Sequence, residues 1–256
     1  MTNWQPTMKF MDLNQKFLVA KGAEPNLTYA EYRSRLVVRN IRQGKQMRRL
    51  GPIMASGGSW EDPGRPVFEE VVKNFGILPH HRFIDYGCGT FQVGVHFIRY
   101  LNPGNYFGLE VESGIADVGR QMLGEELIKE RKVRTGVIRA DFEAAVAFGA
   151  DIIHSCWVCR HVHPDEREDY FDRLSRLTHR PRARLIFDAV VGEDTVGHRA
   201  TVLPASMYVK ALPKLRLRKM HQRGYTKDGN AFVEFEFVRP DKPGSILSCA
   251  LDLLRV

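Results

Sequence analysis

Acidic side chains follow three short apolar segments of the chain: Asp85, Glu110 and Asp141. The first acid precedes a glycine turn, Gly87-Cys88-Gly89-Thr90, and glycines let a backbone turn tightly and approach a ligand closely. An acid about 20 residues beyond such a turn is placed to accept hydrogen bonds from ribose hydroxyl groups. Glu110 has this spacing, so the three acids and the turn together indicate a nucleotide-type ligand.

A second group of reactive side chains lies in the run from Ser155 to Pro164, namely Cys156, Cys159, His161 and His163. Their types suit zinc, but four ligands within eight residues would strain a tetrahedral site. A Cys-x-x-Cys redox pair is another alternative, although that motif normally opens a helix in a smaller fold. We favour a mixed set of side chains that line a site, and we predict no metal site.

Strands and helices must alternate to position these residues. Apolar runs predict strands at 83–85, 106–110, 133–138, 151–157 and 183–191. Helical spacing predicts helices at 28–50, 66–75, 93–101, 113–130 and 164–177. Alternating polarity at 215–220 and 232–238 predicts an antiparallel pair joined by residues 224–230, at the edge of a mostly parallel sheet.

The fold class predicted from this alternation is α/β, with a sheet wound on both faces. Residues 1–27 lack a clear period and are expected to form a loose arm or a short helix. We expect two parts, an N-terminal helical cap or substrate region at residues 1–78 and a Rossmann-like domain at residues 79–256. The loop at 51–66, which holds Trp60, and the polar segment at 192–214 are expected to cover an acceptor.

Composition limits the classes of protein that fit the chain. Its 256 residues suffice for one large domain, and four unevenly spaced cysteines make no disulfide framework, which favours a cytoplasmic location. We see no signal peptide and no apolar run near the ~20 residues that span a bilayer, so we expect no membrane insertion. The formal charge of +8 suggests an anionic partner, and a role in solubility alone explains it equally well.

From Arg82 to Val191 the chain resembles the class I S-adenosylmethionine-dependent methyltransferases. In that family the first strand ends in an acid and a Gly-x-Gly turn, which Asp85 and the turn after it match. The family commonly has a third glycine where this chain has Phe91. The resemblance implies a doubly wound, mostly parallel seven-stranded sheet whose last strand is antiparallel, in addition to the N-terminal helical cap.

The resemblance also implies which residues would bind S-adenosylmethionine. Glu110 matches the family's acid that holds the ribose, and Asp141 matches the aspartate that contacts the adenine amino group. Phe142 is a candidate wall beside the adenine. The predicted cofactor-binding residues are Asp85, Gly87, Cys88, Gly89, Thr90, Glu110, Val111, Asp141, Phe142 and Cys156.

In this family the run that begins at Ser155 would face the transferable methyl group. Transfer to an oxygen needs an aligned acceptor and the removal of a proton from a hydroxyl group. Imidazole titrates near neutrality, so His161, with His163 as second choice, is the candidate general base, and a structural role for each stays open. Arg160 would bind an acidic group of the acceptor or pair with Asp165.

We therefore predict an S-adenosylmethionine-dependent methyltransferase that modifies an oxygen of a small-molecule or saccharide acceptor, with an anionic acceptor as one option. The alternatives are methylation of tRNA or rRNA, which the basic helix at 28–50 keeps open, and a non-catalytic protein that binds the cofactor. A nicotinamide-dependent enzyme is disfavoured, because its usual motif needs glycine at position 92, which is Gln92. The sequence gives no indication of the oligomeric state.

Overall fold

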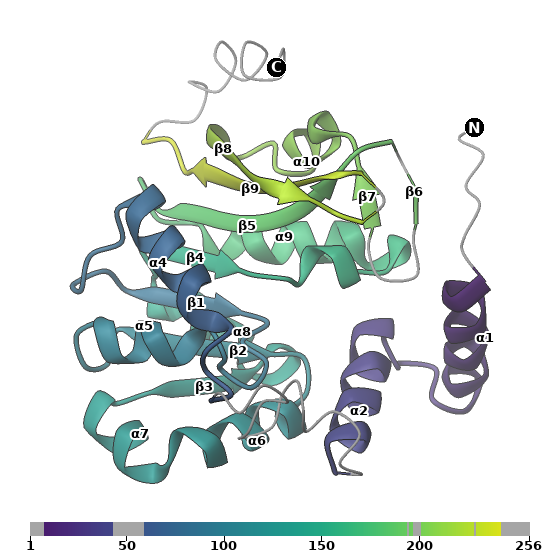
Figure 1. Cartoon of the computed structure of the whole chain (residues 1–256), viewed down its shortest axis with the longest axis horizontal. Helices are drawn as coiled ribbons and strands as arrows, with labels where there is room; N and C mark the ends of the chain where they lie inside the picture. Colours follow the sequence, from purple (N-terminus) through teal and green to yellow (C-terminus); the bar gives the residue numbers. More distant parts are fainter. Residues whose placement is uncertain (1–7, 43–58, 194, 197–200, 228, 242–256) are drawn as a thin grey trace. The chain divides into compact units, whose positions relative to one another are not determined.

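The computed structural model describes residues 8–42, 59–193, 195–196, 201–227 and 229–241, which Figure 1 draws as a coloured ribbon. The chain forms two compact units, one of Met1–Tyr32 with Asp151–Val256 and the other of Arg33–Ala150. The predicted boundary between residues 78 and 79 stays a prediction. Residues 43–50 of the helix expected at 28–50 and residues 51–58 of the loop expected at 51–66 lie outside the described residues, as do residues 242–256.

Three parallel strands form the sheet of the unit Arg33–Ala150, in the order β3 (Arg134–Val137), β2 (Tyr106–Glu110) and β1 (Phe83–Tyr86). Every residue of β1 and β2 is buried, as expected for strands that are covered on both faces. The register pairs Asp85 with Gly108 and Glu110 with Val137. The carboxyl ends of β1 and β2 therefore lie side by side.

Helices precede, connect and follow these strands. They are α4 (Gly64–Phe75), α5 (Gly94–Tyr100), α6 (Ser113–Leu123), α7 (Glu125–Arg131) and α8 (Ile138–Phe148). The α4 helix ends at Gly76, as the sequence predicts, because that glycine adopts the left-handed conformation with a φ of 60°. The single helix expected at 113–130 is wrong: Gly124, with a φ of 78°, divides it into α6 and α7.

The other unit contains a sheet with both strand directions. Its strands are β4 (Ile152–Ser155), β5 (Arg184–Val191), β6 (Thr195–Val196), β7 (Thr201–Leu203), β8 (Arg216–Tyr225) and β9 (Ala231–Val238). The β5 strand is parallel to β4 and β7, and antiparallel to β9 along its whole length. The β9 strand then pairs with β8, so that β5, β9 and β8 run side by side (Figure 1).

The two faces of this sheet differ in chemistry. Phe187, Phe235 and Phe237 lie on one face, where Phe187 and Phe235 contact Tyr208 of α10 (Ala205–Ala211). Phe171 of α9 (Arg167–Leu177) completes this aromatic cluster. Side chains alternate along a strand, so the intervening residues belong to the opposite face, where the buried acids are Asp188, Glu234 and Glu236.

The N-terminal segment is helical, with α1 (Met8–Ala23) and the first turn of α2 (Tyr29–Arg42) in this unit. Phe17, Leu27 and Tyr29 bury their side chains together. The Glu166 carboxylate accepts hydrogen bonds from the backbone N–H groups of Tyr29 and Ala30, at 3.2 Å from the latter, so it caps α2. Residues 1–27 were expected to form a loose arm or a short helix, and the structure shows a 16-residue helix, α1, within them.

The predicted fold class is confirmed: the chain is α/β, with parallel strands at its centre, an antiparallel last strand and a helical N-terminus. The described residues hold nine strands rather than the seven predicted, and β6 and β7 are the short additions, within the polar segment at 192–214, for which no strand was predicted. Among the described helices, none combines the length and the apolar character needed to cross a bilayer.

Candidate functional site

The glycine turn after β1 leaves room for a ligand along its backbone. Gly87 and Gly89 both adopt left-handed conformations, with φ values of 78° and 55°. The N–H groups of Gly87 and Cys88 donate to the carbonyl oxygen of Leu109, at 2.7 and 3.0 Å, which fixes the turn on β2. A Cβ added at Gly89 would meet no atom within 4 Å, so open space adjoins this backbone.

Glu110, the last residue of β2, has a buried carboxylate that backbone groups hold in place. Its Oε2 accepts from the N–H of Gly89 and its Oε1 from the N–H of Val111, each at 2.8 Å. Burial raises the pKa of Glu110, and these two hydrogen bonds counteract the rise. A carboxylate has about four acceptor positions, so this one can still accept two hydroxyl groups.

Asp85, in β1, lies beside the hydroxyl group of Tyr106. That hydroxyl donates to Oδ2 of Asp85 at 2.6 Å, and a Cβ at Gly94 would lie 2.9 Å from the same oxygen. Glycine at position 94 therefore makes room for this hydrogen bond. Burial raises the pKa of Asp85 to about 7, the Tyr106 bond lowers it, and the nearby charge of Glu110 adds to the rise.

Phe91 occupies the place of the family's third glycine and adopts a glycine-like conformation, with a φ of 60°. Its ring is fully buried. A Cβ at Gly108 would lie 2.8 Å from Cε1 of this ring, and a Cβ at Gly119 would lie 2.5 Å from Cδ2. Glycines on β2 and α6 thus provide the space that the phenyl ring takes up at the turn.

The helix expected at 93–101 lies close to its observed bounds, since α5 spans Gly94–Tyr100 and does not begin directly after the glycine turn. The reason is the conformation of Phe91, whose positive φ cannot be part of a right-handed helix. The backbone of the turn, rather than a helix end, therefore adjoins the open space at Gly89.

Asp141 and Phe142 lie in the first turn of α8, and not at the end of a strand as predicted. The β3 strand ends at Val137, where the chain enters the helix. Oδ2 of Asp141 accepts from the N–H of Val137 at 2.7 Å, so this carboxylate satisfies a donor at the helix start. Phe142 is buried, with 8% of its side chain exposed.

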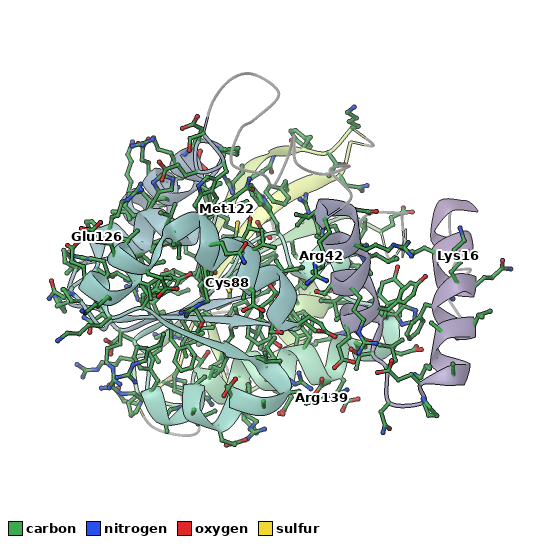
Figure 2. The ribbon with its side chains drawn as sticks, turned by 90° about the horizontal axis from the view of Figure 1, so that it is seen from below. Lys16, Arg42, Cys88, Met122, Glu126 and Arg139 are labelled. Carbon is green, nitrogen blue, oxygen red and sulfur yellow. The ribbon has the colours of Figure 1, made fainter. Side chains whose placement is uncertain are left out.

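Two further residues of the predicted cofactor set are buried at the turn. Figure 2 shows Cys88 in the interior, whereas Glu126 lies at the outer edge. Burial raises the pKa of the Cys88 thiol, as do the charges of Glu110 and Asp85. Oγ1 of Thr90 is buried and has no hydrogen-bond partner among the described residues. Both side chains are thus buried at the turn, and their contact with a cofactor stays a prediction.

In the other unit, the segment after β4 depends on Asp188, a residue of β5 that sequence reasoning missed. Oδ1 of Asp188 accepts from the N–H of Trp157 at 2.7 Å, and Oδ2 accepts from Sγ of Cys156 at 3.4 Å. Trp157 has a φ of 59°, a conformation that bulky residues rarely adopt. The sequence feature that could have pointed to Asp188 is its position as a lone acid inside an apolar strand, Leu185–Val191.

The environment of Asp188 shifts the pKa of its carboxyl group. Burial raises the pKa of Asp188 to about 6, while the Trp157 amide, Arg160, Cys156 and Arg223 counteract the rise. The guanidinium of Arg160 lies over the ring of Phe232, 5.8 Å from its centroid. An interaction of Arg160 with an acceptor's acidic group thus stays a prediction.

The two histidines proposed as bases occupy different environments. His161 ends the 3₁₀ turn Cys159–His161 and is partly exposed. His163 is buried against the rings of Phe17 and Tyr29, with ring centroids 6.1 and 4.9 Å away, and its Nδ1 accepts from the N–H of Asp165 at 3.3 Å. Burial lowers the pKa of His163. Packing against the N-terminal helices is the role that these contacts support for His163.

The structure brings the predicted residues together in two sets. Those of the glycine turn, β2 and α8 belong to one unit, and Cys156, His161 and His163 belong to the other. Cys159 is buried, and burial raises the pKa of its thiol. Among the described residues, no group of three or more histidine, cysteine or acidic side chains is arranged to hold a metal ion.

Comparisons with known proteins identify the fold. No protein-family model matches the chain, and no curated protein matches its sequence. The chain is similar to magnesium protoporphyrin IX methyltransferase (ChlM) from Synechocystis PCC 6803 with bound SAM, with 18% identity and a TM-score of 0.51 over 70% of this chain and 79% of that chain. Geranyl diphosphate C-methyltransferase from Streptomyces coelicolor A3(2) gives 16% identity and a TM-score of 0.51, over 68% and 79% of the two chains.

The [4+2]-cyclase SpnF also shares the fold, with 12% identity and a TM-score of 0.58 over 80% of this chain and 93% of that chain. The chain therefore has the fold of class I S-adenosylmethionine-dependent methyltransferases. Because this fold also occurs in a cyclase, activity has to be argued from the residues of the site.

Proposed function

We propose that the chain binds S-adenosylmethionine and transfers its methyl group to an acceptor. One observation carries the proposal. Open space adjoins the backbone of Gly89, and the N–H of the same residue donates to the buried carboxylate of Glu110. Backbone that is free of a Cβ admits a ligand closely, and an oriented carboxylate selects a ligand with a diol. Adenosine provides that diol.

The residues present fit the cofactor as the resemblance implies. Glu110 would accept the two ribose hydroxyl groups, and Asp141 would accept from the adenine amino group, with Phe142 beside the ring. Asp85 would contribute negative charge near the cationic end of the ligand when its carboxyl group is ionised, which its raised pKa of about 7 restricts to the higher pH values. When bound, the cofactor supplies an electrophilic methyl group on a positively charged sulfur.

We propose that the acceptor is a small molecule or a saccharide and that an oxygen is methylated. His161 is the proposed base, because it is partly exposed and follows β4 by six residues, while His163 is packed among aromatic rings. Arg160 would bind an acidic group of the acceptor. Residues 1–78 are proposed to take part in selecting the acceptor. Two of the solved structures named above are a methyltransferase of magnesium protoporphyrin IX and a C-methyltransferase of geranyl diphosphate.

Methylation of RNA is the second candidate, and the basic surface of α2 favours it. The helix carries Arg33, Arg35, Arg39 and Arg42, and the chain has a formal charge of +8. Against it, Arg35 pairs with Glu112 at 2.8 Å, which engages one of these charges within its own unit. Exposed charges of this kind are more often a solvated helix face than a nucleic-acid site.

Calorimetry with S-adenosylmethionine and S-adenosylhomocysteine tests the cofactor. We expect both to bind, NAD not to bind, and Gly89→Ala to weaken binding because its Cβ would enter the open space. A matched control is Gly76→Ala, another left-handed glycine with no atom within 4 Å of an added Cβ, at the end of α4. Binding of NAD in place of S-adenosylmethionine would refute the proposal.

Methyl-labelled cofactor, offered with separate pools of metabolites, saccharides and RNA, then identifies the acceptor class. Label in a small-molecule or saccharide fraction supports the proposed acceptor, and label in RNA supports the second candidate. We expect His161→Ala to lower turnover near neutral pH. If the protein binds the cofactor tightly and labels no pool, a non-catalytic role replaces the proposed reaction.

A further inference from the structure

Asp188 is buried in β5, with 2% of its side chain exposed, and both of its carboxylate oxygens are engaged by the segment that follows β4. Its partners are consecutive, the Sγ of Cys156 and the backbone N–H of Trp157. One side chain on a central strand thus fixes two neighbouring residues of the segment that leads to His161.

The segment needs such support because Trp157 is strained. Its φ of 59° lies in the left-handed region, which disfavours a residue with a bulky side chain. Strained backbone persists only where surrounding contacts determine it. The 2.7 Å hydrogen bond to Asp188 is such a contact, and it acts on the N–H of the strained residue itself.

Charged and titratable groups surround Asp188 on several elements. Arg160 comes from the 3₁₀ turn after β4, Arg223 from β8, and Glu234 is the partner of Asp188 in the β5–β9 register. His154, on β4, is buried, and its pKa falls to about 3, so this imidazole stays neutral. The thiols of Cys156 and Cys159 are further titratable neighbours among the described residues.

We propose that Asp188 is a positioning residue for methyl transfer: its carboxylate holds Cys156 and Trp157, and through them the turn that carries Arg160 and His161, in the active conformation. The inference rests on the proposed function, because it concerns the same segment. Asp188 itself need not touch the acceptor or the cofactor. Its effect is on the geometry of residues that would.

A pH dependence follows from this arrangement. Burial raises the pKa of Asp188 to about 6, so the carboxylate is mostly ionised above pH 7 and protonated below pH 5. Protonation turns one acceptor oxygen into a donor, and the carboxyl group then no longer accepts from both the thiol and the amide. We expect the segment to loosen as the pH falls through about 6.

The first experiment observes Trp157 directly and needs no activity. The chain has three tryptophans, so ¹⁵N-tryptophan labelling gives a simple amide spectrum, in which Trp157→Phe identifies the signal. We expect the Trp157 backbone amide to shift with a midpoint near pH 6 in the wild-type protein. A signal that does not change between pH 5 and 8 would overturn the proposal, whatever the protein's reaction.

The second experiment measures transfer of labelled methyl groups by Asp188→Asn. The amide keeps the size of the side chain and cannot ionise. We therefore expect kcat to fall at least tenfold, while the Kd of the cofactor stays within twofold. In the wild-type protein we expect the rate to fall as the pH drops through about 6, and this fall should be absent in the variant. Asp169→Asn is the control, since Asp169 is exposed and, within the part of the chain that the structure describes, pairs with Arg173 of the same helix at 2.7 Å.

The outcomes separate the two proposals. Wild-type turnover and an unchanged pH profile in Asp188→Asn would refute the positioning role while leaving the proposed function intact. If the wild-type protein transfers no methyl group, the proposed function fails, and the amide titration alone decides whether Asp188 holds this segment.

Discussion

Glu110 shows how a single carboxylate is prepared for a ligand, since two backbone N–H groups hold it at 2.8 Å each. In Glu110→Gln the side chain keeps its size, but its NH₂ group must face one of the two donors. We expect the affinity for S-adenosylmethionine to fall at least tenfold, about 1.4 kcal/mol, as measured by calorimetry.

The control for this variant is Glu112→Gln, two residues along the chain. Glu112 pairs with Arg35 at the surface, and exposed pairs contribute about 0–1 kcal/mol. Its cofactor affinity should stay within twofold of the wild-type value. Equal affinity of Glu110→Gln and the wild-type protein would show that this carboxylate does not bind the ligand.

Asp85 links the site to the stability of the chain. Burial raises its pKa to about 7 in the folded state, so the folded protein binds this proton more tightly than the unfolded chain does. The associated stabilisation is present below the ordinary pKa of aspartate and is lost as the pH rises through about 7. The neutral variant Asp85→Asn avoids this loss. We expect its free energy of unfolding at pH 8 to be about 2 kcal/mol higher than that of the wild-type protein.

Urea denaturation at pH 5 and pH 8 measures this effect. The increase in the free energy of unfolding caused by Asp85→Asn should be smaller at pH 5, where Asp85 of the folded wild-type protein is mostly protonated. Tyr106→Phe removes the donor 2.6 Å from Oδ2, so it should lower stability more at pH 8 than at pH 5. A gain of equal size at both pH values would contradict the raised pKa as its cause.

At the scale of elements, α6 approaches the glycine turn through Gly119. A Cβ there would lie 2.5 Å from Cδ2 of Phe91 and 2.8 Å from the backbone of Thr90. Overpacking of this kind typically costs 1–3 kcal/mol, so we expect Gly119→Ala to lower the free energy of unfolding by about 2 kcal/mol in urea. Gly22→Ala in α1, where an added Cβ meets no atom within 4 Å, should cause no loss. Equal stability of the two variants would show that the ring can move aside.

The start of α2 shows a local and a distant cap on one helix. Thr28 and Glu31 form a reciprocal pair, with Oε2 of Glu31 2.9 Å from the N–H of Thr28 and Oγ1 of Thr28 3.1 Å from the N–H of Glu31. Glu166 adds acceptors for the N–H groups of Tyr29 and Ala30. Together these contacts satisfy the backbone N–H groups at the start of α2.

We expect Glu166→Ala to loosen this cap by about 1 kcal/mol, since loss of a capping acceptor typically costs that much. Amide hydrogen exchange in residues 13–32 should then quicken about fivefold. The adjacent exposed Glu168→Ala serves as the control. Unchanged exchange in Glu166→Ala would mean that the local pair suffices.

At the scale of the whole molecule, the formal charge of +8 makes the dependence on salt informative. A protein that neutralises several phosphates of RNA loses affinity steeply as salt rises. A small acceptor that contacts one or two cations does not. We expect the acceptor KM to change less than threefold between 50 and 200 mM salt, measured by methyl transfer. A loss of 100-fold or more would favour RNA as the substrate.

Features that depend on neighbouring residues could be predicted from the sequence. Apolar runs and helical periods predicted most of the elements near their observed bounds, and the spacing from the glycine turn to Glu110 singled out two groups that are bonded at 2.8 Å. The sequence pattern wrongly placed Asp141 at the end of a strand. In a short segment, the pattern of residues does not distinguish an acid in the first turn of a helix from an acid at a strand end.

Only the tertiary structure decided how distant residues support these features. Asp188 contacts a segment about 30 residues away, Glu166 caps a helix at Ala30, 136 residues away, and Gly108 and Gly119 make room for Phe91. These contacts depend on strand register and on helix packing, which no local period encodes. The same burial that the tertiary structure imposes raises the pKa values of Asp85 and Asp188, because an ionised carboxylate loses its hydration there.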